Sequence, residues 1–308
     1  MLARIAWNAS QTNPLQGQII LGELIATLEE MNTAPHAKLY TGAKLCLFQM
    51  TDDDSEAVKK FLRDNTLTLK ELSSSTESEV AAVHSAYYQT AMELYKKIGP
   101  AQEFYKHAIQ FLHYTPLFTM DPADSQALAR DLCLAALVGE GVYNLGTVVY
   151  ENAELLAVLK GGEDGYLVEL MKSAAEGDVG AVKTLEVHQA KLEGSGCDVK
   201  VIQEKVMLLA LVNMVFEKGS SERTMKFGDI GERLQVEAEQ VEWIVMKALS
   251  LGLIKGSMDQ VDGVVDVTWV MPRVLDENMM KGLATRFEEW AAKVGETREY
   301  MGERIPAF

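Results

Sequence analysis

The segment that comes nearest to a ligand-binding pattern is GDVGAVKT, residues 177–184. A phosphate-binding loop has the pattern GxxxxGK[ST], whose glycines let backbone N–H groups surround the phosphates while the lysine contacts them. In this chain Val182 stands where the glycine before Lys183 is required. The segment also lies between two expected helices and does not follow a strand. We therefore expect no nucleotide site at this position.

The histidines are too scattered to suggest a metal or catalytic centre. The sequence contains no HExxH, His-x-His or GxSxG motif. His107 and His113 are six residues apart, which places them on different faces of a helix and disfavours joint metal ligation. The five histidines are His36, His84, His107, His113 and His188.

The three cysteines, Cys46, Cys133 and Cys197, have no CxxC spacing. They indicate neither a disulfide framework nor a zinc site, so we expect reduced and packed thiols. No group of residues converges on a reaction centre by type and spacing. We expect a protein without enzymatic activity, metal or other cofactor.

The composition is that of an acidic globular protein. The chain has 308 residues, a formal net charge of −16 and 48% hydrophobic residues, enough for about two domains with proper cores. The negative charge disfavours nucleic acids and anionic membrane surfaces as partners. The sequence has no apolar run of about eighteen residues and no signal-peptide pattern at its start. We therefore expect a protein of the cytoplasm and nucleus.

The first two-thirds of the chain are expected to fold as helical hairpins. The string YYQTAMELYKKIGPAQEFYKHAIQFLHY, residues 87–114, predicts two helices that meet at Gly99-Pro100. Ala91 and Ala108 are small residues placed where these helices approach closely. A hairpin of this kind cannot bury its apolar face alone, so the hairpins should stack into a solenoid similar to tetratricopeptide repeats.

Residues 236–275 predict the second half of a winged helix. An apolar stripe of helical period is followed by Gly252, a suitable left-handed cap, and then by two strands around a polar turn at 259–263. Val265, Val267 and Trp269 alternate in the second strand. The stripe consists of Val241, Ile244, Val245, Ala248 and Leu249.

The charges of this winged helix argue against DNA binding. Residues 203–272 contain seven Lys or Arg against eleven Asp or Glu, whereas a DNA-binding face needs several cations to displace phosphate counterions. We therefore expect a protein-docking module. The strand at 264–270 is predicted to be an exposed edge that pairs with a neighbouring protein through Val265, Val267 and Trp269.

Residues 275–301 predict a separate amphipathic helix after the winged helix. Its apolar residues recur at spacings of three and four, with charged residues on the other face. Such a helix either packs back on its own domain or joins a bundle with helices of other chains, and we favour the bundle. The apolar residues are Leu275, Met279, Leu283, Phe287, Trp290 and Val294.

Helical repeats, a winged helix and a trailing helix together resemble the PCI family, whose members occur in the proteasome lid, the signalosome and a translation initiation factor. Two strings and the helix with Phe287 and Trp290 are most similar to a proteasome lid subunit: LCLAALVGEGVYNLG (132–146) and VEWIVMKALSLGLIKGSMDQVDGVVDVTWVMPRVLD (241–276). The resemblance implies a non-catalytic scaffold of the 19S regulatory particle lid that supports lid assembly and ubiquitin-dependent protein degradation. The implied partners are other lid subunits, through winged-helix edges and a helical bundle, and a neighbouring ubiquitin receptor.

The resemblance also predicts how the chain is divided. Residues 1–105 are expected to form N-terminal repeats, 106–272 a PCI domain with a helical part (106–200) and a winged helix (203–272), and 273–308 a bundle helix. Two alternatives remain open. The chain is a scaffold of the signalosome or of the initiation factor, or it is a winged-helix protein that binds nucleic acid.

Overall fold

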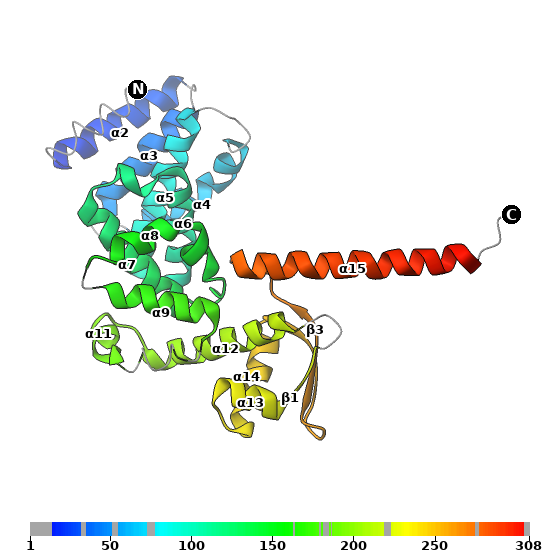
Figure 1. Cartoon of the computed structure of the whole chain (residues 1–308). Coiled ribbons are helices and arrows are strands. Elements are labelled where there is room, and N and C mark those ends of the chain that lie inside the picture. Colours follow the sequence, from blue (N-terminus) through cyan, green and yellow to red (C-terminus); the bar gives the residue numbers. More distant parts are fainter. Residues whose placement is uncertain are drawn as a thin grey trace. The chain divides into compact units, whose positions relative to one another are not determined.

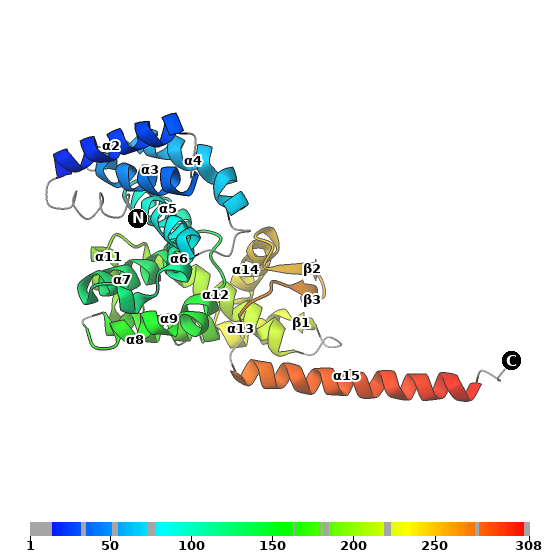
Figure 2. The same cartoon turned by 90° about the horizontal axis from the view of Figure 1, so that it is seen from above.

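The structure of the chain is a computed structural model, and its helices divide between two compact units. The repeat unit comprises Met1–Tyr143, Ala157–Glu169 and Val182–Lys205, and the terminal unit comprises Asn144–Leu156, Leu170–Ala181 and Val206–Phe308. We describe each unit by itself (Figures 1 and 2). The structure describes residues 14–31, 35–50, 55–72, 78–162, 164–178, 180, 185, 187–218, 223–274 and 277–304.

The repeat unit is built from helices that pack on their neighbours along the chain. Contacts join α2 to α3, α3 to α4 and α5, α4 to α5, α5 to α6, and α6 to α7. This confirms the predicted mostly α-helical architecture. The helices are α2 (Pro14–Met31), α3 (Pro35–Gln49), α4 (Ser55–Leu72), α5 (Ser78–Ile98), α6 (Ala101–Tyr114), the 3-10 turn η2 (Leu117–Thr119), α7 (Pro122–Val138) and α11 (Gln189–Gly194).

The α5–α6 hairpin forms as the sequence predicts. Ala91 and Ala108 are completely buried, which allows the two helices to approach closely. Gly99 has a positive φ of 74° at the turn, a conformation that glycine adopts at little cost. Pro100 is the N-cap of α6. The predicted domain boundary between residues 105 and 106 falls inside α6, so the structure has no joint there.

Four elements link or complete the two units. The helices α8 (Ala153–Leu159), α9 (Gly165–Glu176) and α12 (Val199–Glu217) each have residues in both units. The short π-helix η3 (Thr147–Glu151) belongs to the terminal unit.

A buried lysine ties the first part of α12 to the end of α7 within the repeat unit. Lys205 is 5% exposed, and its Nζ donates hydrogen bonds to the carbonyl oxygens of Ala136 at 2.6 Å and Gly139 at 2.9 Å. Carbonyls at a helix C-terminus lack partners within the helix and attract cations. Burial nevertheless lowers the pKa of Lys205 to about 7, because the charged form loses its hydration.

The terminal unit contains a winged helix. Strand β1 (Thr224–Lys226) leads into α13 (Phe227–Leu234) and α14 (Ala238–Ser250), and the strands β2 (Ile254–Asp259) and β3 (Val264–Val270) follow. Four residues of the predicted stripe on α14 are confirmed as core, since Val241, Ile244, Val245 and Ala248 are at most 2% exposed. The fifth, Leu249, is half-buried. The long helix α15 (Glu277–Arg304) follows the sheet.

Gly252 ends α14 as predicted, with a positive φ of 69°. Its N–H donates to the Leu249 carbonyl at 3.1 Å, and the Leu253 N–H donates to the Ala248 carbonyl at 3.0 Å. These are the two hydrogen bonds of a Schellman motif, which provide partners for the last carbonyls of the helix and reverse the chain. The turn delivers Leu253 and Ile254, both buried, to the start of β2.

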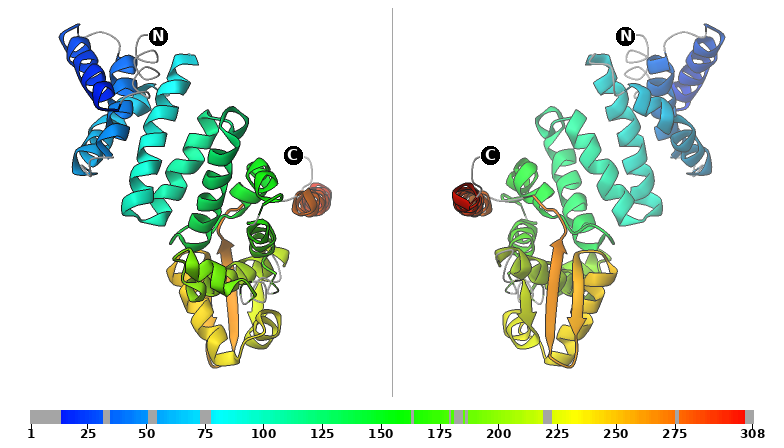
Figure 3. Two further views of the ribbon diagram at one scale, coloured as in Figure 1. Left: turned by 90° about the vertical axis from the view of Figure 1, so that its left-hand side faces the viewer. Right: turned by 90° about the vertical axis from the view of Figure 1, so that its right-hand side faces the viewer.

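The strand order corrects the prediction of an exposed edge at 264–270. The sheet has the order β1-β3-β2 with antiparallel pairing, so β3 is the central strand (Figure 3). Val265 pairs with Met225 on one side and with Met258 on the other. Val265 and Val267 are buried and face the core, and only Trp269, 37% exposed, reaches the surface. The prediction was wrong because the short strand β1, some 40 residues earlier, covers this edge.

Our first prediction concerns the pH dependence produced by Lys205. Between pH 7 and 10.5, the unfolded chain carries the lysine proton that the folded protein has released, so protonation favours unfolding. The free energy of unfolding of the wild type should therefore rise with pH in this window, relative to that of Lys205→Met. Below about pH 7 the difference should be constant. Urea denaturation at a series of pH values measures it, and a difference independent of pH would contradict the assignment.

Our second prediction concerns Gly256, which lies at a bulge in the β2–β3 pairing. A Cβ at this position would collide with the backbone of Asp266 and approach the Cα of Val267 to 3.0 Å. Gly256→Ala should lower the free energy of unfolding by about 1–3 kcal/mol, because the central strand has to shift. Urea denaturation followed by tryptophan fluorescence measures this change.

The matched control for this prediction is Gly228→Ala in α13. A Cβ there meets nothing within 4 Å, and alanine favours the helix by up to about 1 kcal/mol. Equal destabilisation by the two variants would show that the sheet does not impose the constraint at Gly256.

Candidate docking site

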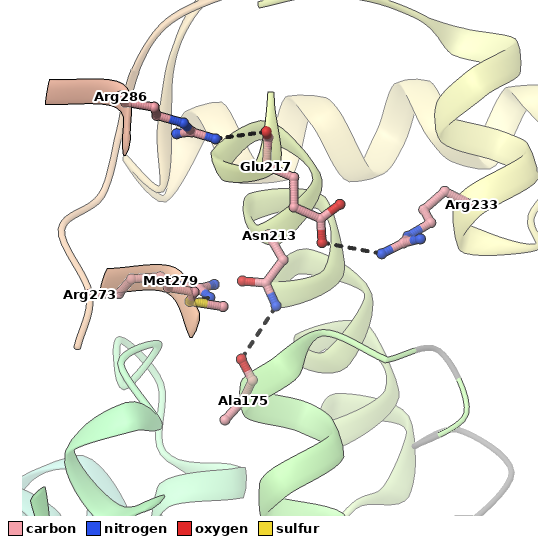
Figure 4. A network of polar contacts seen from close by, with 7 residues as sticks. All are labelled: Ala175, Asn213, Glu217, Arg233, Arg273, Met279 and Arg286. Carbon is pink, nitrogen blue, oxygen red and sulfur yellow. Dashed lines mark hydrogen bonds and ion pairs between the residues drawn. The ribbon is translucent and has the colours of Figure 1, made fainter. Parts of the chain in front are cut away.

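The trailing helix α15 is anchored near its start to the end of α12, within the terminal unit (Figure 4). The Arg286 guanidinium donates hydrogen bonds to the carbonyl oxygens of Phe216 at 3.1 Å and Glu217 at 2.8 Å. These are the last carbonyls of α12. A cation at this place provides partners for unpaired carbonyls and also complements the negative end of the helix dipole.

A second arginine completes the anchor around Phe216. The guanidinium carbons of Arg273 and Arg286 lie 5.2 Å and 5.8 Å from the centroid of the Phe216 ring, within cation–π range. Arg273 also contacts the sulfur of Met279, at 2.9 Å. The base of α15 is thus held by polar and aromatic contacts.

The segment that leads into α15 is fixed as well. The Val274 N–H donates to Oδ1 of Asn144 at 3.1 Å. A Cβ on Gly146 would lie 2.9 Å from the Cβ of Val274, so glycine is required for this close approach. Gly146 and Asn144 belong to the string 132–146 that carried the family resemblance.

Asn213 and Glu217 connect α12 to other parts of the terminal unit (Figure 4). Asn213 Nδ2 donates to the Ala175 carbonyl at 3.3 Å, and Glu217 pairs with Arg233 of α13 at 3.3 Å. The Glu217 and Arg233 side chains are both more than half exposed, so this pair contributes little to stability. The Arg286 hydrogen bonds to the backbone of α12 attach α15 to this part of the terminal unit.

The rest of α15 projects away from the terminal unit (Figures 1 and 2). Every residue from 287 to 301 is exposed. The predicted apolar stripe divides at this point. Met279 and Leu283 are half-buried near the anchor, whereas Phe287, Trp290 and Val294 are 61%, 65% and 47% exposed. Leu275 lies outside the described residues.

Met301 extends the stripe, and the sequence analysis missed it. It is 55% exposed and lies seven residues after Val294, which is two helical turns further along the same face. A search by steps of three and four residues stops at Val294, because Thr297 and Arg298 follow; a step of seven residues, two helical turns, finds Met301. Leu283, Phe287, Trp290, Val294 and Met301 are called the α15 stripe below.

The free edges of the sheet are β2 and the three-residue strand β1, since β3 lies between them. Strand β2 is paired on one side only among the described strands and is six residues long. Its backbone groups on the other side are therefore available to a further strand. Lys255 on β2 lies 4.8 Å from the Trp269 ring centroid and covers part of this aromatic side chain.

The residues that could have carried chemistry do not assemble into a site. Among the described residues, no group of three or more His, Cys, Asp or Glu side chains could hold a metal ion. All three thiols are free and buried, and burial raises the pKa of Cys46 and Cys133 to about 12 and that of Cys197 in the same direction. The expectation of packed thiols is confirmed.

The segment 177–184, tested above as a phosphate loop, follows α9, a helix. Its described residues Gly177, Asp178 and Gly180 form a turn in which Asp178 Oδ1 accepts a hydrogen bond from the Gly180 N–H at 2.9 Å. Val182 and Lys183 lie outside the described residues.

None of the described helices combines the length and the apolar character that crossing a bilayer requires.

Two family models match the chain. Residues 2–171 match the PSD13 N-terminal repeats, and residues 198–269 match the PCI domain. The second match covers all of α12 and the winged helix up to residue 269, and it ends before α15. The presence of a PCI domain is therefore confirmed over residues 198–269, whereas its expected start at residue 106 stays a prediction.

Individual relatives agree with these models. The chain is 31% identical over 282 residues to the 26S proteasome non-ATPase regulatory subunit 13 homolog B of Arabidopsis thaliana, an alignment that covers 90% of this chain and 71% of the relative. It is 31% identical over 215 residues to the 26S proteasome non-ATPase regulatory subunit 13 of Dictyostelium discoideum, which covers 68% of this chain and 55% of the relative.

A more distant relative represents one of the alternatives. The eukaryotic translation initiation factor 3 subunit M of Phaeosphaeria nodorum is 23% identical over 66% of this chain and 45% of its own length. Both the identity and the coverage are lower than for the proteasomal relatives. Residues 2–171 match the PSD13 N-terminal repeats, and the Arabidopsis protein is 31% identical over 90% of the chain. The chain therefore belongs to the family of the 26S proteasome non-ATPase regulatory subunit 13.

Proposed function

We propose that the chain is a non-catalytic scaffold subunit of the lid of the 26S proteasome 19S regulatory particle, where it supports lid assembly and ubiquitin-dependent protein degradation. The observation that carries the proposal is α15, a helix fixed at its base by Arg286 while Phe287, Trp290 and Val294 remain exposed. A row of large apolar side chains in water favours association. Their helical spacing suits a bundle with helices of other subunits.

The winged helix provides the second docking surface. Its free strand β2 suits pairing with a neighbouring subunit, and its acidic charge disfavours DNA. We assign this role to the backbone of β2 and to exposed Trp269, in place of the buried Val265 and Val267. Partners would be other lid subunits and a neighbouring ubiquitin receptor, in the cytoplasm and nucleus.

The proposed function depends on surfaces and requires no reaction at any side chain of this chain. The raised pKa values of the three cysteines keep their thiols protonated near neutral pH, which removes the most reactive nucleophiles of the sequence. We retain the division into N-terminal repeats, a PCI domain and a bundle helix as a functional division, with the first boundary moved out of α6.

Our third prediction tests the α15 stripe. Phe287→Glu with Trp290→Glu places two charges in the proposed bundle core and should reduce incorporation of a tagged full-length chain into the 26S particle by ~10-fold or more. Native gels and sedimentation of cell extracts measure incorporation. The melting temperature of the purified variant should not fall, because both side chains are exposed.

The matched control is Thr285→Glu with Ala292→Glu, which adds the same charge to exposed positions on the opposite face of α15. It should incorporate as the wild type does. Equal incorporation of the stripe variant and the control would rule out the bundle. Mass spectrometry of the proteins that co-purify distinguishes the assemblies, since recovery of signalosome or initiation-factor subunits without proteasomal ATPases would overturn the lid assignment.

A further inference from the structure

A pocket in the repeat unit lies among α4, α5 and α6, and none of its lining residues belongs to the docking surfaces described above. Its volume is about 380 Å³, which lies within the usual range for small-ligand sites. One wall is a face of α4 and the other comes from aromatic side chains of α5 and α6. The charged and aromatic lining residues include Lys59, Arg63, Lys70, Tyr88, Tyr95 and His107.

The charge of the pocket is opposite to that of the whole chain. Lys59, Arg63 and Lys70 line it, and none of its described lining residues is acidic, although the sequence has 45 Asp and Glu against 29 Lys and Arg. A positive concavity in a negative protein attracts anions that the remaining surface repels. The pocket therefore has the electrostatic character of an anion site.

Two of the three cations are available to a ligand. Arg63 and Lys70 are exposed and make no hydrogen bond or ion pair within the described part of the chain. Lys59 pairs with Glu56 at 3.0 Å, an exposed contact on the same helix that a ligand can replace at small cost. On α6, Glu103 forms an ion pair with Lys106 at 2.7 Å. Its negative charge is therefore compensated by a residue outside the cationic row of α4.

The opposite wall is aromatic and preformed. The Tyr95 ring stacks on His107 with centroids 5.2 Å apart and an interplanar angle of 8°, and Tyr88 lies 6.0 Å from His107. Burial lowers the pKa of His107, so this imidazole acts as part of the apolar wall near neutral pH. Tyr87 donates a hydrogen bond to the Leu62 carbonyl at 2.8 Å and thereby holds α4 against α5.

The spacing of the cations decides which anion fits. Arg63 and Lys70 are seven residues apart on α4, a rise of about 10 Å, and Lys59 extends the row to about 16 Å. One phosphate group cannot contact charges separated by that distance. An extended peptide advances about 3.3 Å per residue, and every second side chain lies on the same face. Carboxylates four residues apart therefore lie roughly 13 Å apart on one face, with one further side chain midway between them, and are within reach of the long Arg63 and Lys70 side chains.

We propose that this pocket binds an acidic peptide segment of another protein. Its carboxylates pair with Arg63 and Lys70, and an apolar side chain between them packs on Tyr88 and Tyr95. Nucleic acid fits less well, because the net charge of −16 repels a long polyanion outside the short cationic row. The proposal does not rest on the lid assignment, and its test uses the isolated full-length chain.

Our fourth prediction is tested by fluorescence anisotropy with the labelled peptide Glu-Glu-Glu-Leu-Glu-Glu. It should bind the wild type at low ionic strength and dissociate as salt is added, because paired charges are screened. Its counterpart with glutamine in place of every glutamate should not bind. Arg63→Gln with Lys70→Gln should weaken binding by ~10-fold or more, through loss of two charge-assisted hydrogen-bonding groups.

The control variant is Lys60→Gln with Lys172→Gln, which removes two exposed lysines that do not line the pocket. It should bind the peptide within about twofold of the wild type, since it changes the net charge of the protein by the same amount but leaves the pocket intact. Unchanged melting temperatures should show that both variants are folded. No peptide binding by the wild type, equal loss in both variants, or full displacement by an equal concentration of inorganic phosphate would overturn the proposal.

Discussion

The hydrogen bonds from Arg286 to the last carbonyls of α12 are the contact on which the proposed docking role depends. Without this anchor, α15 would be free either to turn back and bury its apolar stripe on its own unit or to move independently of it. With Arg286 fixed at 3.1 Å and 2.8 Å from two backbone carbonyls, the exposed part of the α15 stripe begins one residue beyond the attachment, at Phe287. The same residue therefore closes the terminal unit and determines where the docking surface starts.

Local patterns in the sequence were sufficient for the helices and their caps. The stripe from Val241 to Ala248 and the left-handed Gly252 follow from helical period and glycine chemistry alone. The strand order was not accessible in this way. β1 has only three residues, Thr224 to Lys226, which show no alternation long enough to identify a strand. Its pairing with β3 joins residues about 40 apart in sequence, and such contacts leave no local signal.

The same limit applies to the two surfaces that carry the proposals. The period of α15 could be found from the sequence, but nothing in the sequence distinguished Arg286 from the other charged residues of this helix. Its role depends on Phe216 and Glu217, 70 and 69 residues away. The peptide pocket combines a charged face of α4 with rings from α5 and α6, and no single segment contains its pattern. The sequence shows which residues are charged or aromatic, but only the folded structure shows which of them lie together.

The distribution of the few basic residues explains how an acidic chain can be selective without a reactive site. Lys205 is buried and its Nζ donates hydrogen bonds to the carbonyls of Ala136 and Gly139, while Arg286 donates to those of Phe216 and Glu217. Both side chains are engaged at helix ends and are unavailable to partners. Arg63 and Lys70 have no such internal acceptor in the described structure, so their charge is directed outward. Because the whole chain has a net charge of −16, an acidic partner is repelled by the molecule in general, and selectivity follows from this repulsion as much as from attraction in the pocket.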